Sequence, residues 1–425
     1  MFFRVSSARA LIVGLAVTTV SAISQISIKG SKFFTDDGNQ FYIKGVAYQL
    51  TPHDPLLDTN QCTVDASLMH ELGANAIRVY HVGPTGDHKG CMDAFAAKGI
   101  YVFADLDTFN TQINQDDVHW NQSQLTAFTK VLDEFVQFDN TAGVFIGNEV
   151  ITMANGSDAA PYIKAAVRDV KSYRDSKKIR KVPIGYSAAD IAELRPMLQN
   201  YLVCGTDPSE SIDFFALNAY EWCGSSSYTV SGYDQLTKNV TGYPVPIFFS
   251  ETGCNTNRPR DFADQSAILG DQMDSYWSGA IIYEWIEEAN DYGLIQYGDR
   301  TNSSESILDG YPRSGTPTPI SPDFNNLKSQ WATLSPTGVK ESAYSPTNSP
   351  PPCPSSTHDG WRINGDVSLP TLGQTYTAGA TPTGTATGSA ASATATKKGT
   401  ASGRKEITGM TIGLVGVMFG FMWWL

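Results

Sequence analysis

The stretch GVFIGNE, residues 143–149, is an unbroken apolar run that stops at an amide and a carboxylic acid. Uninterrupted apolar strands are typical of parallel sheets that are covered on both faces. Seven more runs rich in Val, Ile, Phe and Tyr recur along the chain, and several of them also end in a polar or charged residue. They are Phe41–Tyr48, Ala76–Tyr80, Ile100–Leu106, Lys181–Ser187, Asp213–Tyr220, Val245–Glu251 and Gly279–Ile286.

The stretches between these runs carry the spacing of amphipathic helices. Apolar residues recur every three or four positions at Leu125, Phe128, Val131, Leu132, Phe135 and Val136. Strands that alternate with helices predict an α/β fold, and eight strands in one domain favour a closed (β/α)8 TIM barrel. A doubly wound open sheet is the alternative fold. No G-x-G-x-x-G motif follows an early strand, so we expect no dinucleotide cofactor.

Both ends of the chain have the composition of targeting signals. The apolar run Leu11–Val20 follows two arginines and precedes small residues, which predicts a signal peptide over residues 1–22. At the other end, Ile407–Leu425 is almost entirely apolar and follows a short polar spacer, which predicts a GPI-anchor propeptide over residues 404–425. A single membrane-spanning helix is the alternative for this tail. Either reading places the protein at the cell surface, facing outward.

The part between these signals divides by composition. Residues 23–334 have the apolar content of one globular domain, which we assign to the barrel. Residues 335–376 form an extension that contains Cys353 and Trp361, and residues 377–403 are a low-complexity Ser/Thr/Ala/Gly segment. Such a segment buries too little apolar area to offset its chain entropy, so we expect a disordered, O-glycosylated stalk that carries the anchor site.

Export to an oxidising compartment makes the six cysteines candidates for disulfides. They are Cys62, Cys91, Cys204, Cys223, Cys254 and Cys353. Their spacing indicates no metal site, and the residues alone do not select one pairing among the many that are possible. Possible glycan sites in the same compartment are the Asn-x-Ser/Thr sequons at Asn121, Asn155, Asn239 and Asn302.

The net charge of −13 argues against a nucleic-acid partner, because such proteins supply positive charge to replace phosphate counterions. A neutral substrate is compatible with this charge. Aromatic residues make up 11% of the chain, and their rings can stack on the apolar faces of sugars, although most of them are expected to fill the core.

Two acids end strands on opposite sides of the predicted barrel, where the chemistry of such barrels gathers. Glu149 closes the fourth run and Glu251 closes the seventh. Glycoside cleavage needs one carboxylic acid to protonate the leaving oxygen and a second carboxylate at the anomeric carbon. Asn148, directly before Glu149, supplies an amide that can bond the 2-hydroxyl of a sugar. These residues predict a retaining glycoside-cleaving site.

The same residues resemble a known family, the fungal GPI-anchored β-1,3-glucanosyltransferases of glycoside hydrolase family 72. The resemblance runs from about Ile26 to about Trp331. It rests on KGVAYQ (44–49), IRVY (77–80), YVFADL (101–106), GNE (147–149) and FFSETGCN (248–255). The chain is similar to members that lack a further cysteine-rich module after the catalytic domain.

The resemblance implies roles for individual residues. Glu149 would be the acid/base and Glu251 the nucleophile of a TIM-barrel enzyme that needs no cofactor and no metal. The glucan contacts would come from Tyr80, Asn148, Asp190, Arg195, Tyr220, Tyr283 and Gln49, with Asp107, Asn114 and Gln115 as further candidates from residues 107–115. The family pattern also implies the disulfides Cys62–Cys91, Cys204–Cys353 and Cys223–Cys254.

The resemblance further implies an activity. The enzyme would cleave an internal linkage of a β-1,3-glucan donor and join the new reducing end to the non-reducing end of an acceptor glucan, which elongates the cell-wall polymer. We expect a monomer that a GPI lipid attaches to the outer face of the plasma membrane, to the wall, or to both. A β-1,3-glucan hydrolase with the same carboxylates is the closest alternative. A non-catalytic glucan-binding wall protein is the alternative from another class.

Some site residues have plain structural alternatives. Tyr80 and Tyr283 could serve as barrel packing, and Asp190 and Arg195 could form a surface ion pair of little energetic weight. Thr252 stands where many members of the family have an aromatic residue. The run Asp107-Thr108-Phe109 also departs from the family, which more often has polar residues and Pro there.

Overall fold

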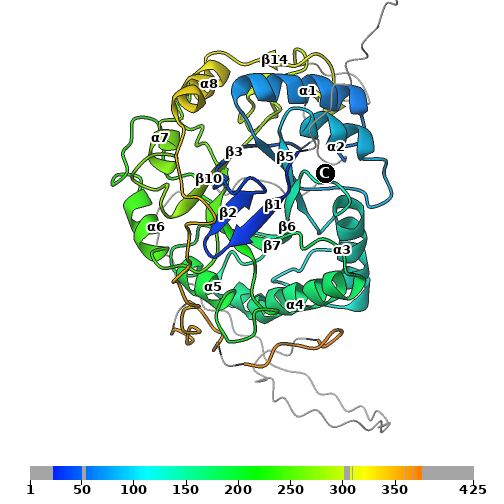
Figure 1. Ribbon diagram of the computed structural model, residues 1–425, viewed down its shortest axis with the longest axis vertical. Coiled ribbons are helices and arrows are strands. Elements are labelled where there is room, and N and C mark those ends of the chain that lie inside the picture. The colour runs from blue at the N-terminus through cyan, green and yellow to red at the C-terminus, as the bar shows by residue number, and fades with distance from the viewer. Residues whose placement is uncertain are drawn as a thin grey trace, which may run out of the picture. The chain divides into compact units, whose positions relative to one another are not determined.

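The computed structural model of the protein describes residues 23–49, 54–300, 307–308, 310–358, 360–365 and 367–375 (Figure 1). The predicted signal peptide (1–22), the stalk (377–403), the anchor propeptide (404–425) and the sequon at Asn302 lie outside these residues. No helix among the described residues has the length and apolar content needed to cross a membrane.

Eight parallel strands close into a barrel in the order β10-β3-β4-β5-β6-β7-β8-β9. This confirms the (β/α)8 fold and excludes the open-sheet alternative, because β10 pairs with β3 in parallel. Each strand overlaps one of the eight predicted runs. Their bounds are β3 Ile43–Ala47, β4 Ala76–Val79, β5 Tyr101–Asp105, β6 Thr141–Asn148, β7 Ile184–Ala189, β8 Phe214–Asn218, β9 Ile247–Thr252 and β10 Trp277–Ile282.

Helices form a ring around the barrel (Figure 1). On α3, the residues Phe128, Val131, Leu132 and Phe135 that set its spacing are all buried, so the apolar stripe faces the strands. Its first turn begins at a capping box, in which Asn121 and Gln124 exchange side-chain and backbone bonds. The helical elements are α1 Thr59–Leu72, α2 Lys89–Ala96, α3 Gln122–Phe135, the 3-10 turn η1 Ala154–Ala159, α4 Ala160–Lys177, α5 Arg195–Tyr201, α6 Tyr233–Asn239, α7 Asp264–Ile268 and α8 Asp323–Thr333.

A hairpin that the apolar runs do not predict closes one end of the barrel. Its strands β1 (Ile26–Lys29) and β2 (Lys32–Thr35) pair antiparallel, and they lie across the centre of the ring in Figure 1. Phe33 of β2 is fully buried, with its ring centroid 6.0 Å from those of Phe214 and Phe248. The barrel is therefore filled by stacked side chains, as expected of this fold.

Glycine makes room for these rings inside the barrel. A Cβ at Gly185 of β7 would lie 2.2 Å from the ring of Phe214. Because interiors are close-packed, this position tolerates no side chain without displacing the ring.

Two short antiparallel strand pairs lie on the connection that follows β10. They are β11 (Ile295–Gln296) with β14 (Thr318–Pro319), and β12 (Ile307–Leu308) with β13 (Tyr311–Pro312). The structure contains three disulfides, Cys62–Cys91, Cys204–Cys353 and Cys223–Cys254, which is the pairing that the family resemblance implies.

The extension after α8 packs along the outside of the barrel. We call it the C-terminal strap and define it as residues 335–375, apart from 359 and 366. It begins next to the hairpin, where the Glu341 N–H donates to the Gly38 carbonyl at 2.9 Å. Trp361 is fully buried, with its ring 5.5 Å from that of Tyr201. The orange segment of Figure 1 follows this path from α8 past α5 toward α4.

Candidate active site

The residues proposed for the site lie at the carboxyl ends of the barrel strands. Because all eight strands are parallel, these ends meet at one mouth of the barrel. Tyr80, Glu149, Asp190 and Tyr283 each directly follow a strand, and Glu251 is the next to last residue of β9. Gln49, Asp107 and Tyr220 follow two residues after β3, β5 and β8.

Glu149 stands at the point where β6 turns into its loop. Its backbone has φ of 48°, a left-handed conformation that is uncommon for a residue with a side chain. Its N–H still donates to the Ser187 carbonyl of β7 at 2.9 Å, so the turn is anchored to the neighbouring strand. The carboxylate accepts a 2.9 Å hydrogen bond from Asn218 Nδ2.

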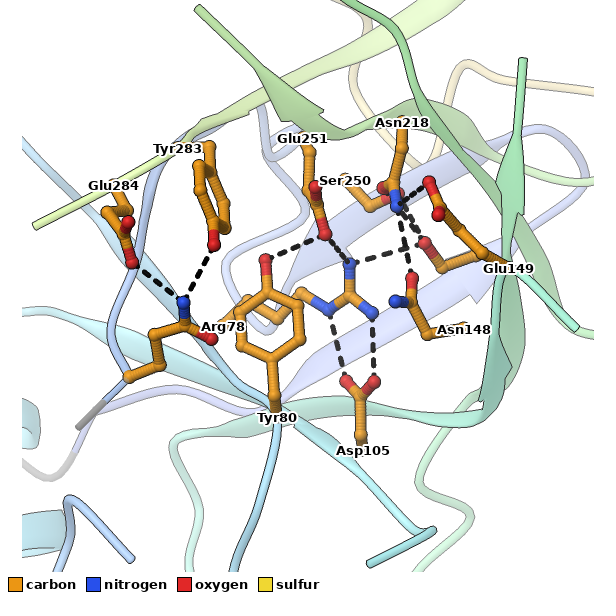
Figure 2. Close-up of polar contacts among 12 residues, drawn as sticks. Arg78, Tyr80, Asp105, Asn148, Glu149, Asn218, Ser250, Glu251, Tyr283 and Glu284 are labelled. Atoms are coloured by element: carbon orange, nitrogen blue, oxygen red, sulfur yellow. Dashed lines mark hydrogen bonds and ion pairs between the residues drawn. The ribbon is translucent and has the colours of Figure 1, made fainter. Parts of the chain in front are cut away.

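Glu251 is surrounded by donors (Figure 2). Its Oε2 accepts from the Tyr220 hydroxyl at 2.8 Å, and its Oε1 accepts from the Tyr80 hydroxyl at 3.0 Å. Nη1 of Arg78 lies 3.4 Å from Oε1. Three donors of this kind stabilise the charged form of a carboxylate and fix its direction.

Arg78 is a fully buried charge on β4. Its guanidinium makes a two-pronged ion pair with Asp105 of β5, with contacts of 3.0 and 2.8 Å. The guanidinium carbon also lies 4.3 Å from the ring centroids of Tyr80 and Phe145. A buried arginine needs such partners, and the pairing leaves Nη1 directed at Glu251.

Burial dominates the titration of Glu251. It raises the pKa of this carboxyl to about 7, Arg78 and the hydroxyls of Tyr220 and Tyr80 oppose the rise, and the charge on Glu149 adds to it. The two glutamates therefore lie close enough to influence each other electrostatically. A buried carboxyl beside a second acid is the arrangement expected where one fold uses two carboxyl groups in different roles.

A chain of hydrogen bonds through Asn218, Ser187 and Arg78 connects the two glutamates (Figure 2). Asn218 donates to both Glu149 and Asn148, while its own oxygen accepts from the hydroxyls of Ser187 and Ser250. Ser187 in turn accepts a 3.2 Å contact from Arg78. The position of Glu149 is thereby tied to the group that holds Glu251.

Tyrosine rings form a wall beside Glu251. The ring of Tyr283 lies edge-on to those of Tyr80, Tyr220 and Tyr292, at centroid distances of 6.5, 6.4 and 5.3 Å. Gln49 Nε2 donates to the Tyr283 hydroxyl at 2.8 Å and to the carboxyl of the fully buried Glu284 at 2.8 Å. The Tyr80 and Tyr283 rings do pack, but their hydroxyls belong to the polar network, so packing alone does not account for them.

Asp190, directly after β7, and Arg195, at the start of α5, form an ion pair with each other. The pair is not a surface feature, because the two side chains are only 10% and 9% exposed. Burial lowers the pKa of Arg195, and the neighbouring charge of Glu221 opposes this change.

Three predicted glucan-binding residues, Asp107, Asn114 and Gln115, lie on the connection after β5 and make different kinds of contact. Burial and the charge of Asp105 raise the pKa of Asp107 to about 7. Asn114 Oδ1 accepts from the Asp116 N–H at 2.8 Å, which is a turn contact. Gln115 uses both ends of its amide on Thr152, at 2.6 and 3.0 Å. Asn114 and Gln115 are therefore engaged within the loops themselves.

Several site residues were not singled out by sequence reasoning. Arg78 carried a signal, since a charge inside a run as apolar as β4 requires a partner. Asn218, Ser187 and Ser250 carried none, because small polar residues near strand ends are common. Tyr292 lies on a connection where no strand register places it. Among the described residues, no cluster of His, Cys, Asp and Glu has the arrangement of a metal site.

A closed (β/α)8 barrel that joins an acid after its fourth strand to a buried carboxylate on its seventh defines the class of two-carboxylate glycoside-processing enzymes. Comparison with known families identifies the branch of this class. The family model described as "Glucanosyltransferase" matches residues 15–335, and the chain belongs to this family, glycoside hydrolase family 72.

Curated relatives agree with this assignment. The 1,3-beta-glucanosyltransferase gas2 of Schizosaccharomyces pombe is 41% identical over 80% of this chain and 74% of its own length. The 1,3-beta-glucanosyltransferase GAS2 of Saccharomyces cerevisiae is 40% identical over 75% of this chain and 57% of its own length. The chain thus spans between about half and three quarters of such relatives.

A solved structure has the same fold. It is a mutant of Saccharomyces cerevisiae Gas2p in complex with laminaritetraose and laminaripentaose. It superposes with a TM-score of 0.73 at 39% identity, and the match covers 82% of this chain and 74% of that chain.

Proposed function

We propose that this protein is a retaining β-1,3-glucanosyltransferase that elongates cell-wall glucan. The observation that carries the proposal is the setting of Glu251, a carboxylate oriented by Tyr80, Tyr220 and Arg78. Hydrogen bonds through Asn218 and Ser187 connect Arg78 to Glu149. The relatives are named for this transfer, and the Gas2p structure holds laminari-oligosaccharides.

The first half of the cycle cleaves the donor. The Glu251 carboxylate attacks the anomeric carbon while the Glu149 carboxyl gives its proton to the glycosidic oxygen. One carbon–oxygen bond forms to Glu251, the glycosidic bond breaks, and the reducing-end fragment leaves with the proton. Direct attack requires the two carboxyl groups to stand about 5–5.5 Å apart.

The second half joins the acceptor. Glu149, now a carboxylate, takes the proton of the 3-hydroxyl at the non-reducing end of a second glucan. The resulting oxygen attacks the anomeric carbon, Glu251 leaves as a carboxylate, and a new β-1,3 bond forms. Two inversions retain the configuration, and the pair of acids returns to its first protonation state.

The neighbouring residues bind the sugar in this scheme. Asn218 holds the oxygen of Asn148, so the amide NH2 is the end that we assign to the sugar 2-hydroxyl. Tyr220 and Tyr283 supply rings for stacking and Gln49 orients Tyr283. We assign Asp107 and the Asp190–Arg195 pair to glucan contacts away from the cleaved bond. Asn114 and Gln115 would shape the loop that carries Asp107.

Phe109 suits a glucan contact of the same kind. Its side chain is 49% exposed, and its ring stacks on His81 with 4.0 Å between centroids. An exposed ring backed by a second ring is a platform for the apolar face of a sugar.

We place the enzyme outside the cell as a monomer, attached by a GPI lipid to the plasma membrane or the wall. Three disulfides in the described chain support an oxidising compartment. The sequons at Asn155 and Asn239 are exposed, which suits glycan attachment there, and Asn121 is partly exposed.

Product length separates transfer from hydrolysis. With a single laminari-oligosaccharide as substrate, mass analysis is expected to find products longer than the substrate, together with the shorter fragments. Fragments alone would establish the hydrolase. The Glu251→Gln variant serves as the control, because it is expected to bind the oligosaccharide and form neither class of product.

A further inference from the structure

The C-terminal strap reaches the catalytic mouth of the barrel, although the matched family region ends at residue 335. The Gly373 N–H donates to the Trp120 carbonyl at 2.8 Å, and Thr375 forms a bridge with His119. Trp120 and His119 belong to the connection between β5 and α3, just before the first residue of α3. In this fold helices run opposite to the strands, so the start of α3 lies at the carboxyl ends of the strands.

A second contact of the strap touches the connection that starts with Glu149. The Arg362 N–H donates to Ser157 Oγ at 3.0 Å, and the Arg362 side chain lies 3.7 Å from Asp158. Ser157 belongs to η1, between β6 and α4. Only seven positions separate it from Val150, whose N–H donates to the Tyr186 hydroxyl at 3.0 Å directly after the acid/base.

The two connections are also joined to each other at the mouth. Gln115 exchanges two hydrogen bonds with Thr152, at 2.6 and 3.0 Å. Its amide lies against Gly156, where a Cβ would come within 1.9 Å of Gln115 Oε1. The strap therefore contacts two connections, residues 106–121 and 149–159, that are also hydrogen-bonded to each other.

The strap is itself fastened at several points along its path. The disulfide Cys204–Cys353 and the buried Trp361 hold its middle, and Arg168 of α4 donates to the Pro370 carbonyl at 3.0 Å. Asp169, the next residue on α4, accepts from the Trp120 indole at 3.0 Å. A segment held at both ends restricts the loops it contacts, because they then move only if it moves.

We propose that the C-terminal strap is a positioning element of the transferase. It fixes the connections 106–121 and 149–159 so that Glu149 keeps one place relative to Glu251 and water is kept from the glycosyl-enzyme. The catalytic unit then extends to residue 375. This inference rests on the proposed function, because it assigns a task within that reaction.

A substitution at Ser157 tests the contact between the strap and η1. Ser157→Ala in the full chain removes the acceptor for the Arg362 N–H, and it also removes the sequon at Asn155. Asn155→Gln, which removes the sequon alone, is therefore measured beside it and is expected to keep the wild-type kcat. Ser176→Ala is the matched control, since both hydroxyls donate to the carbonyl three residues earlier and Ser176 is exposed on α4. We expect Ser157→Ala to lower kcat about threefold with little change in KM, because misplaced catalytic groups slow chemistry more than binding. The control is expected to match the wild type.

Replacement of a whole segment tests the contacts at the C-terminal end of the strap. Residues 367–375 of the full chain are replaced by Gly and Ser in equal number, which keeps the Cys353 bridge and Trp361. Hydrogen exchange is expected to rise on the order of tenfold in peptides covering 106–121 and 149–159 and to stay unchanged in the barrel strands. The share of hydrolysis products is expected to rise as kcat falls.

Two results would overturn the positioning role. One is unchanged exchange in both loops with unchanged kcat and product ratio. The other is faster exchange throughout the barrel, which would make the strap a general staple. Failure of the proposed function is recognised separately, because the wild type would then form no elongated product whatever the strap variants do.

Discussion

Glu251 combines features that stability alone disfavours. It is 9% exposed, and burial raises its pKa to about 7, yet the reaction needs it ionised. The hydroxyls of Tyr80 and Tyr220 and the guanidinium of Arg78 offset part of the cost of that charge. Placing a carboxylate where it is poorly solvated makes it a better nucleophile and a worse contributor to folding.

The stability of Glu251→Gln is expected to show this cost. A folded pKa of about 7 lies above the value of an unfolded glutamate, so the wild type loses stability as pH rises through about 7, and the amide does not. In urea unfolding, the variant should gain on the order of 2–3 kcal/mol over the wild type between pH 4 and pH 8. Glu193→Gln, at an exposed position, should show no such trend. If the difference in the free energy of unfolding between Glu251→Gln and the wild type does not change with pH, the account is contradicted.

Tyr220→Phe is expected to move the acid side of the pH–rate profile. Its hydroxyl lowers the pKa of Glu251, so its loss raises that pKa, and the nucleophile becomes protonated at a higher pH. The acid limb of kcat/KM should shift upward by about half to one pH unit. Tyr283→Phe is the comparison, because that hydroxyl bonds to Gln49 rather than to Glu251. If the acid limb of kcat/KM has the same apparent pKa in both variants, Tyr220 does not have this role.

At the scale of elements, the barrel could be predicted because continuous apolar strands differ plainly from amphipathic helices. Glu149 and Glu251 were located by the same signal, since each ends an apolar run. Strand β10 was placed too late in the sequence, because the apolar run continues through Ile286 after the pairing has ended at Ile282. The hairpin β1–β2 was not anticipated, as its strands are short and its partners are distant.

The role of Asn218 and the contacts of the strap could not be predicted from the sequence, because both depend on residues that are distant along the chain. Asn218 acts through residues from three other strands, so its role depends on the register of the whole sheet. Gln115 is a further example, because the sequence did not predict that its amide bonds to Thr152 on the connection after β6. Local pattern predicts which residues end strands and does not predict which of them bond to one another.

The hairpin is expected to stabilise the barrel through Phe33. Replacing this fully buried ring by Ala removes packing against Phe103, Phe214 and Phe248 and leaves a cavity. The free energy of unfolding should fall by about 3–5 kcal/mol. Phe109→Ala, at a ring that is 49% exposed, is expected to change it by less than about 1 kcal/mol. Denaturant unfolding of both variants checks this, and equal losses would mean that the hairpin does not seal the core.

At the scale of the molecule, one chain joins a barrel, a strap and predicted targeting ends. The net charge of −13 suits a neutral polymer rather than an anionic one. Composition predicted an extension over residues 335–376, and the structure follows it to residue 375, where it contacts the connection before α3. The barrel supplies the strand ends that carry Glu149 and Glu251, and the strap contacts the connections that follow β5 and β6.

Covalent trapping tests the central claim most directly. A laminari-oligosaccharide donor with fluorine at C2 and a good leaving group should glycosylate the nucleophile and hydrolyse slowly, because the fluorine destabilises the oxocarbenium-like transition state. After digestion, mass spectrometry is expected to find the added sugar on Glu251. An adduct on Glu149 or Glu284 instead, or inactivation without any adduct on Glu251, would contradict the account.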